Sequence, residues 1–367
     1  MGLLKWKLVR EINRIRQQLR GIPEFFSEPA QRRQHDAQRS VLLEPQHGDV
    51  AKRKKIALLL VYQPQGVADS TRWTCEHLVA KGYSPLIISN APLSAADRQM
   101  LAPWVWRMAE RPNFGYDFGG YRDGIWLLQQ WQIAPETLIV LNDSIWFPLT
   151  GNETLIDCME GSSADFVGAL QLDPLRQVEG IPRKKRPFFG SFFLMFKRNA
   201  WEHSAFRMFW SGYENTSNKY KTIRRGERGL SHALMDAGVS YEAIYTRSGL
   251  DAYLGRQSNH ALVRVLQQLV TIDERLETQI ADAVIQFDSS PEWRNRALEL
   301  AMAATEKQNI LATAPIASLS VFAVPYLKKS RDWNNLKALY KVRDAMLEGS
   351  LPIAHASIMN DLNALLD

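Results

Sequence analysis

The feature that most limits the possible folds is a series of short apolar runs between residues 56 and 196, separated by segments with helical periodicity. Five runs have strand length: IALLLVY (56–62), PLIIS (85–89), TLIVL (137–141), DFVGAL (165–170) and FFLMF (192–196). Strands buried on both faces have this composition, and strand–helix alternation predicts a mostly parallel sheet covered by helices on both sides. We therefore expect an α/β fold.

On this pattern the chain divides into three parts. Residues 51–258 carry the alternation of strands and helices. Residues 259–367 show helical periodicity and no comparable strand run, which predicts a helical C-terminal subdomain. Residues 1–50 form the third part. From Gly21 to Lys55 the sequence is rich in Pro, Gln and Arg without periodicity, which predicts a linker.

Residues 3–20 predict a basic amphipathic helix. Their apolar side chains recur every three or four residues and share one helical face, and Lys and Arg occupy most of the remainder. Such a helix binds an anionic membrane surface through its apolar face and through about 1 kcal/mol for each well-placed Lys or Arg. Packing against the rest of the chain or against a second subunit is the alternative.

The positive charge of the chain is confined to its N-terminal part. Residues 1–55 hold 13 Lys/Arg and 6 Asp/Glu, while the net charge of the whole chain is +6, so the remainder is close to neutral. This distribution argues against a nucleic-acid-binding protein. The N-terminus lacks an apolar segment of signal-peptide length, and Cys75 and Cys158 form no disulfide or zinc motif, so we expect a reducing, cytoplasmic location.

Polar residues follow the apolar run 137–141 directly. In open α/β sheets, ligands bind beyond the carboxyl ends of the strands, where Asn142, Asp143 and Ser144 are expected. A carboxylate at this place suits Mg²⁺ or Mn²⁺ bridging a diphosphate, because both cations prefer oxygen ligands. A helix N-cap is the competing interpretation, since Asn, Asp and Ser are also favoured there.

A segment rich in glycine and aromatic residues, RPNFGYDFGGYRDG (111–124), precedes this strand by one predicted helix. Its glycines allow the backbone to approach a ligand closely, Arg111 or Arg122 can neutralise phosphate, and Asp117 can bind ribose, base or sugar hydroxyls. The glycines match neither a Walker A loop nor the dinucleotide-binding fingerprint. A tight structural loop is the alternative to a binding site.

The chain resembles the rhamnan synthesis protein F family of bacterial polysaccharide glycosyltransferases in three blocks: RPNFGYDFGGYRDGI, LIVLNDSIWFPL and FFGSFFLMFKRNA. The resemblance covers residues 56–257, and Pro325–Lys329 looks like a PFLK-type segment of the family's C-terminal region. The order of the blocks is also similar to GT-A glycosyltransferases, which implies a GT-A-like fold. Where the GT-A motif DxD has two carboxylates, this chain has Leu141-Asn142-Asp143. The candidates for a second metal ligand are His232, Asp251 and a water molecule, with a structural role as the alternative for His232.

The resemblance implies a site for a nucleotide-sugar donor. Asp143 and Glu227 are the expected catalytic residues, with Asp143 as ligand of Mg²⁺ or Mn²⁺ and Glu227 as the base that takes the acceptor's proton during transfer with inversion. Glu227 can instead be a first-turn charge that interacts with a helix dipole. The expected donor-binding residues are Arg111, Asn113, Gly115, Asp117, Arg122, Asn142, Asp143 and Ser144. The further candidates are Asp165 and Asp173 for the base, and Gly190 and Ser191 for the acceptor site.

These expectations together predict a glycosyltransferase. It would move rhamnose or a hexose from a nucleotide-sugar donor to a growing lipid-linked surface polysaccharide, such as O-antigen or capsule, as a peripheral protein on the inner face of the bacterial cytoplasmic membrane. The alternative is a non-catalytic sugar- or nucleotide-binding subunit of a polysaccharide assembly complex. The single carboxylate in Leu141-Asn142-Asp143 favours that alternative.

Overall fold

The centre of the molecule is a twisted, mostly parallel sheet. The computed structural model of the chain describes residues 27–172, 186–306 and 308–367. Within them the strands run in the order β1–β4–β3–β2–β5–β9–β7–β10, with β8 beside β7. Their bounds are β1 (Gln46–His47), β2 (Lys55–Val61), β3 (Tyr83–Ser89), β4 (Arg107–Glu110), β5 (Thr137–Asn142), β7 (Phe166–Leu172), β8 (Phe188–Phe189), β9 (Phe193–Lys197) and β10 (Tyr241–Tyr245).

Strands β4, β3, β2 and β5 are parallel neighbours, and β10 is parallel to β7. Strand β9 is antiparallel between β5 and β7, and β1 is antiparallel at the edge next to β4. The mostly parallel α/β sheet that the apolar runs predict is therefore confirmed.

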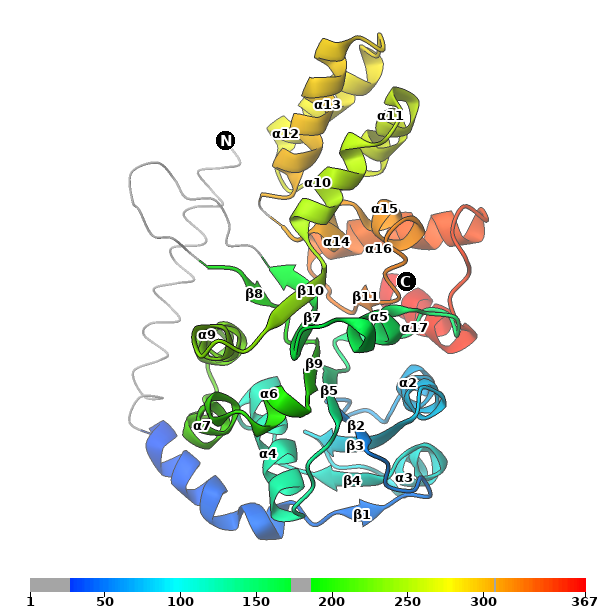
Figure 1. Cartoon of the computed structure of the whole chain (residues 1–367). Coiled ribbons are helices and arrows are strands. Elements are labelled where there is room, and N and C mark those ends of the chain that lie inside the picture. The colour runs from blue at the N-terminus through cyan, green and yellow to red at the C-terminus, as the bar shows by residue number, and fades with distance from the viewer. Residues whose placement is uncertain (1–26, 173–185, 307) are drawn as a thin grey trace.

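Helices cover both faces of the sheet (Figure 1). Alternate residues of each strand point to opposite faces, and β2 shows this clearly: Leu59 and Val61 pack into one apolar cluster, and Leu58 and Leu60 into another. The first face lies under α2 (Asp69–Ala80), α3 (Ala95–Leu101) and α5 (Leu155–Gly161). The second lies under α4 (Tyr116–Gln130), α6 (Arg198–Glu202), α7 (Ser204–Gly212) and α9 (Arg228–Asp236).

The C-terminal region is helical, as expected. Its helices are α10 (Arg247–Gly255), α11 (Asn259–Gln268), α12 (Glu274–Ile285), α13 (Pro291–Ala304), α14 (Ile310–Thr313), α15 (Pro315–Ser320), α16 (Trp333–Leu347) and α17 (Ala356–Leu366). Buried residues of α10 to α13 belong to the same apolar cluster as the first face of the sheet. A short strand, β11 (Leu327–Lys328), pairs antiparallel with β6 (Ile145–Trp146), which follows β5 in the chain. The C-terminal region thus returns to the end of β5.

The prediction of a linker after residue 21 is wrong for residues 27–42, which are helical (blue in Figure 1). Their contacts with the body are polar: Glu28, His35 and Arg39 are buried, and His35 Nε2 lies 2.8 Å from Asp123 Oδ2 of α4. Because charged residues make the buried face, the apolar periodicity that identifies most amphipathic helices is absent. The predicted amphipathic helix at residues 3–20 lies outside the described residues.

Helix α4 approaches its surroundings closely at its glycines. A Cβ on Gly120 would lie 2.1 Å from Leu60 Cδ1, and one on Gly124 would lie 2.4 Å from Leu58 Cδ1, both on β2. A Cβ on Gly119 would lie 2.2 Å from the backbone oxygen of Phe114. These glycines therefore serve the packing of α4 on the sheet and of the loop that precedes the helix.

We expect Gly119→Ala to lower the free energy of unfolding by about 1–3 kcal/mol, the usual cost of overpacking, because the obstructing atom is a backbone carbonyl. Gly161→Ala is the matched control, since Gly161 ends α5 and has no atom within 4 Å of a built Cβ. Urea unfolding of both variants measures the difference. Equal stability of the two would contradict the assigned packing.

Candidate functional site

Several chain segments meet at one edge of the sheet. The parallel strands β2 and β5 end there together, with Leu60 paired to Asn142. Strand β9 runs the other way and therefore begins at this edge, with Phe193 opposite Leu141. The residues before β9, Gly190 to Phe192, consequently lie beside the end of β5. This is the edge at which open α/β sheets bind ligands.

Asp143 is held at the end of β5 by polar contacts from the end of β2. Its Oδ2 accepts hydrogen bonds from the backbone nitrogen of Tyr62 at 2.9 Å and from Gln63 Nε2 at 3.0 Å. Burial raises the pKa of Asp143 above its usual value, although these bonds and the charge of Lys329 act in the opposite direction. Both hydrogen bonds from Tyr62 and Gln63 go to Oδ2, which leaves Oδ1 without a contact to these residues.

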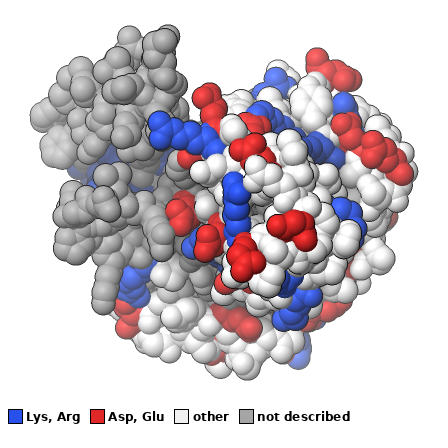
Figure 2. All heavy atoms as spheres, turned by 90° about the horizontal axis from the view of Figure 1, so that it is seen from above, with Lys and Arg blue, Asp and Glu red and all other residues white. Residues whose placement is uncertain are grey.

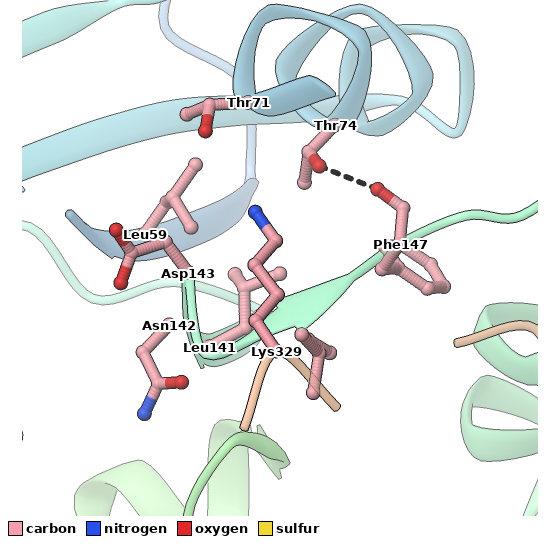
Figure 3. Close-up of a pocket in the computed structure, with 9 residues that line it drawn as sticks. Leu59, Thr71, Thr74, Leu141, Asn142, Asp143, Phe147 and Lys329 are labelled. Carbon is pink, nitrogen blue, oxygen red and sulfur yellow. Dashed lines mark hydrogen bonds between the residues drawn. The ribbon is translucent and has the colours of Figure 1, made fainter. Parts of the chain in front are cut away.

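A small pocket lies next to Asp143 (Figure 3). It has room for about one water molecule. The polar lining consists of Asn142, Asp143 and Lys329 together with Thr71 and Thr74 of α2. The side chain of Lys329 rises beside Asp143 toward these two threonines, so a carboxylate and an ammonium group face the same space.

Asn142 and Ser144 shape the turn after β5. The side-chain oxygen of Asn142 accepts hydrogen bonds from Ser144, from its backbone nitrogen at 3.1 Å and from its hydroxyl at 2.5 Å. The side chains of Asn142 and Asp143 point in different directions (Figure 3). Asn142 therefore stabilises the turn, whereas Asp143 directs its carboxylate toward the pocket.

Two further carboxylates meet at Ser191. Glu227 Oε1 accepts hydrogen bonds from the Ser191 backbone nitrogen at 2.9 Å and from its hydroxyl at 3.0 Å, while that hydroxyl lies 3.3 Å from Asp117 Oδ2. Burial raises the pKa of both carboxyl groups, and the charge of Asp117 adds to the rise at Glu227. Neighbouring carboxyl groups with raised pKa values are suited to accepting and donating protons.

Local backbone geometry brings Glu227 to this position. It ends the π-helical turn η2 (Ile223–Glu227), which follows α8 (Lys219–Thr222) and continues into α9. Gly226 lies against Phe118 of α4, where a Cβ would be 2.5 Å from the ring. Only a residue without a side chain allows the two segments to come this close. Their close approach places Glu227 beside the first turn of α4. Turns of π-helix are frequent at functional sites.

The loop before α4 is organised by Arg111, which is buried. Its guanidinium donates to Asp123 Oδ2 at 2.6 Å, to Asn90 Oδ1 at 2.7 Å and to the Phe114 backbone oxygen at 2.5 Å. Gly115 has a φ of 91°, in the left-handed region that favours glycine.

The other two expected donor-binding residues of this segment lie nearer the surface. Asn113 is exposed, and its side-chain oxygen accepts a hydrogen bond from Asn90 Nδ2 at 3.3 Å. Arg122 forms an ion pair with Asp36, with two contacts of 2.6 and 3.0 Å. Both arginines that the sequence suggests as phosphate ligands thus have carboxylate partners within the chain.

The structure places the remaining sequence candidates elsewhere. Asp165 lies at the opposite, amino end of β7, where its oxygens accept hydrogen bonds from Asn199 and Ser240. His232 contacts the backbone oxygen of Pro187, and Asp251 is exposed on α10. Asp173 lies outside the described residues. In those residues no three His, Cys, Asp or Glu side chains cluster as ligands of a metal ion.

Two lysines at this edge are absent from the residues expected from the sequence. Lys328 is the last residue of β11, and the backbone nitrogen of Lys329 donates to the Ser144 backbone oxygen at 2.8 Å. The resemblance of Pro325–Lys329 to a family segment is the sequence feature that points to them. Their distance in sequence from the strand end, about half the chain, hides the contact.

The fold and the carboxylates at the edge of the sheet define an α/β protein with a candidate ligand site beyond its strand ends. The family model of rhamnan synthesis protein F (RgpF) matches residues 86–278. This match covers more than half of the chain, and the chain belongs to that family.

Two individual proteins resemble the chain. Protein y4gN of Sinorhizobium fredii (strain NBRC 101917 / NGR234) is 34% identical over 239 residues, which are 65% of this chain and 61% of that protein. The mannosyltransferase PcManGT from Pyrobaculum calidifontis, solved in complex with GDP-Man and Mn²⁺, is 11% identical with a TM-score of 0.30, over 94% of this chain and 89% of the other.

Proposed function

We propose that this protein is a glycosyltransferase that takes a sugar from a nucleotide-sugar donor and adds it to a growing bacterial surface polysaccharide. Membership of the rhamnan synthesis protein F family supports the proposal. The observation that carries it is the gathering of Asp143, Asp117 and Glu227 at the ligand-binding edge of the sheet, with Ser191 between the last two. Paired carboxyl groups suit the proton transfer that sugar transfer needs.

The donor would lie over the turn after β5. Asn142 and Ser144 shape this turn, and Arg111 holds the loop before α4 in place. Asn113 and Gly115 of that loop would also contact the donor. Asp143 Oδ1 would hold Mg²⁺ or Mn²⁺ together with oxygens of the donor, since oxygen ligands suit both cations. A bound cation would stabilise the negative charge of the departing nucleotide.

Transfer with inversion assigns the acceptor to the opposite side of the sugar from the nucleotide. The acceptor hydroxyl would bind near Gly190 and Ser191 and give its proton to Glu227 while its oxygen bonds to the anomeric carbon. The bond between that carbon and the diphosphate breaks, and its electron pair leaves with the nucleotide. Asp117 shares Ser191 with Glu227 and raises the pKa of Glu227, which makes the latter a stronger base once it is ionised.

The acceptor and the location follow from the resemblance and the N-terminal sequence. We propose a lipid-linked glycan acceptor, rhamnose or a hexose as the sugar, and attachment of residues 3–20 to the inner face of the cytoplasmic membrane.

No helix in the described part of the chain is long and apolar enough to cross a membrane. On the face shown in Figure 2, acidic and basic side chains of the described residues are interspersed.

Turnover of dTDP-, UDP- and GDP-sugars tests the proposal. We expect release of the nucleoside diphosphate from one donor class, and a fall of about 100-fold or more in Asp143→Ala and Asp143→Asn, because each variant removes the charge at the end of β5. Asp157→Asn is the control, since its carboxylate is exposed on α5 and pairs with Lys81. Full activity in both Asp143 variants would exclude the assigned site.

A non-catalytic sugar- or nucleotide-binding subunit is the second candidate, because the motif Leu141-Asn142-Asp143 has one carboxylate. In that case the wild-type protein binds a nucleotide or nucleotide sugar but does not turn any donor over. Isothermal titration calorimetry beside the turnover assay separates the two functions.

A further inference from the structure

We propose that Lys328 and Lys329 form the binding site for the diphosphate of the nucleotide-sugar donor. The inference rests on the proposed function and deepens it. An anionic donor needs positive charge at this edge of the sheet. The inference assigns that charge to the C-terminal region, which lies far in sequence from the three blocks that resemble the family.

The first observation is the backbone position of the two lysines. Strand β11 pairs with β6, with Lys328 opposite Ile145, and Lys329 continues the pairing through its hydrogen bond to Ser144. Successive residues of an extended strand point to opposite sides. The pair therefore presents one ammonium group on each side of the turn that carries Asp143.

The second observation is the surroundings of each ammonium group. Lys329 lines the pocket beside Asp143 (Figure 3), and its Nζ lies 5.5 Å from the centre of the Trp146 ring. Lys328 Nζ lies 4.3 Å from the centre of the Phe192 ring, next to Ser191, and its charge interacts with Glu227 and Asp117. Lys329 thus lies beside Asp143, and Lys328 lies beside the pair Asp117 and Glu227.

The third observation is that the lysines lack ion-pair partners. Within the described residues neither forms an ion pair of 4.0 Å or less, and burial lowers the pKa of both ammonium groups. Half-buried charges without a close partner cost stability. Arg111 and Arg122, by contrast, are already paired with Asp123 and Asp36.

These contacts assign a definite part of the reaction to the lysines. When the bond from the anomeric carbon to the diphosphate breaks, its electron pair remains on a phosphate oxygen, and the acceptor's proton goes to Glu227. Lys329 and Lys328 stabilise the negative charge that develops on the leaving diphosphate. The other charged side chains described at the site are the carboxylates of Asp143, Asp117 and Glu227 and the two arginines that already pair with Asp123 and Asp36.

Affinities of the full-length protein for UDP, GDP and dTDP and for the matching monophosphates, measured by calorimetry, test the inference. We expect the wild-type protein to bind one diphosphate more tightly than its monophosphate. Lys328→Met and Lys329→Met should each weaken diphosphate binding about tenfold or more, as expected for bonds to charged groups, and should change monophosphate binding little. The preference of the wild-type protein for the diphosphate should also decrease as NaCl is raised.

Lys337→Met is the matched control. Lys337 also lies over an aromatic ring, that of Trp333 at 5.0 Å, but belongs to α16 and pairs with Glu277. The melting temperatures of the two site variants should stay equal or rise, since each variant removes a half-buried, unpaired charge. A purely structural role predicts lower melting temperatures instead.

Three results would overturn the inference, and the third would also overturn the proposed function. If the wild-type protein prefers a diphosphate and both lysine variants keep that preference, or if the preference does not respond to salt, the lysines do not bind the diphosphate while the proposed function stands. If the wild-type protein binds none of the nucleotides and turns over none of the donors, the proposed function fails as well.

Discussion

Replacing Glu227 with glutamine is expected to lower kcat for donor turnover about 10²–10⁴-fold, the usual contribution of a general base. Glutamine keeps the size of the side chain and an oxygen that can accept the hydrogen bonds from Ser191. Donor binding should therefore change little. Glu202→Gln is the control, because Glu202 is exposed on α6. A kcat for Glu227→Gln within a few-fold of the wild-type value would show that another group takes the proton.

The pH dependence of kcat/KM gives a second readout of the same assignment. Glu227 must be ionised to accept a proton, and burial raises its pKa, so activity should rise with pH along a limb that lies above the usual range of glutamate. Asp117→Asn removes a negative neighbour and should move this limb to lower pH. Lys328→Met removes a positive neighbour and should move it to higher pH. Shifts in the same direction would contradict the role of Glu227.

Replacing Asp123 with alanine is expected to lower the free energy of unfolding by about 3–5 kcal/mol, the cost of leaving buried charges without their partner. Asp123 is fully buried on α4, and its oxygens lie 2.6 Å from Arg111 Nε, 2.8 Å from His35 Nε2 and 3.1 Å from Arg39 Nε. Urea unfolding monitored by circular dichroism measures the effect. Asp157→Ala, which breaks an exposed pair with Lys81, should cost less than about 1 kcal/mol.

The same residue makes stability depend on pH. Burial opposes the ionisation of Asp123, but the hydrogen bond to His35 and the neighbouring positive charges, including those of Arg111 and Arg39, together hold the pKa of Asp123 below its usual value. A carboxyl group with a lowered pKa contributes stability that is present above its unfolded pKa and is lost as the pH falls through its folded pKa. The decrease in the free energy of unfolding caused by Asp123→Ala should therefore become smaller in acid. An equal decrease at low and neutral pH would contradict this account.

Asp123 also connects the helical residues 27–42 to the candidate donor site. Through His35 and Arg39 it holds that helix, and through Arg111 it holds the Phe114 backbone oxygen in the loop before α4. Loss of this residue should thus loosen the loop as well as the helix. Hydrogen exchange of the backbone amides of residues 111–116 would detect the change at a temperature where the variant remains folded.

The sequence by itself determined the sheet and the location of the carboxylate at its end. Apolar runs of strand length are local features, and burial on both faces leaves few places for them other than the centre of an α/β fold. The polar residues Asn142-Asp143-Ser144 directly after such a run therefore had to lie at the ligand-binding edge. The resemblance of three blocks to one family, which the family model supports, rested on the same local features.

Only the tertiary structure decided which distant residues meet at that edge. The pairing of β11 with β6 brings Lys328 and Lys329 to Asp143, and the approach of Gly226 to Phe118 brings Glu227 to Ser191. The helical state of residues 27–42 was also hidden, because buried polar contacts of His35 and Arg39 with Asp123 replace an apolar face. Such contacts join side chains that are far apart in the chain, so no local pattern of residue types predicts them. They depend on how the helices and strands pack together.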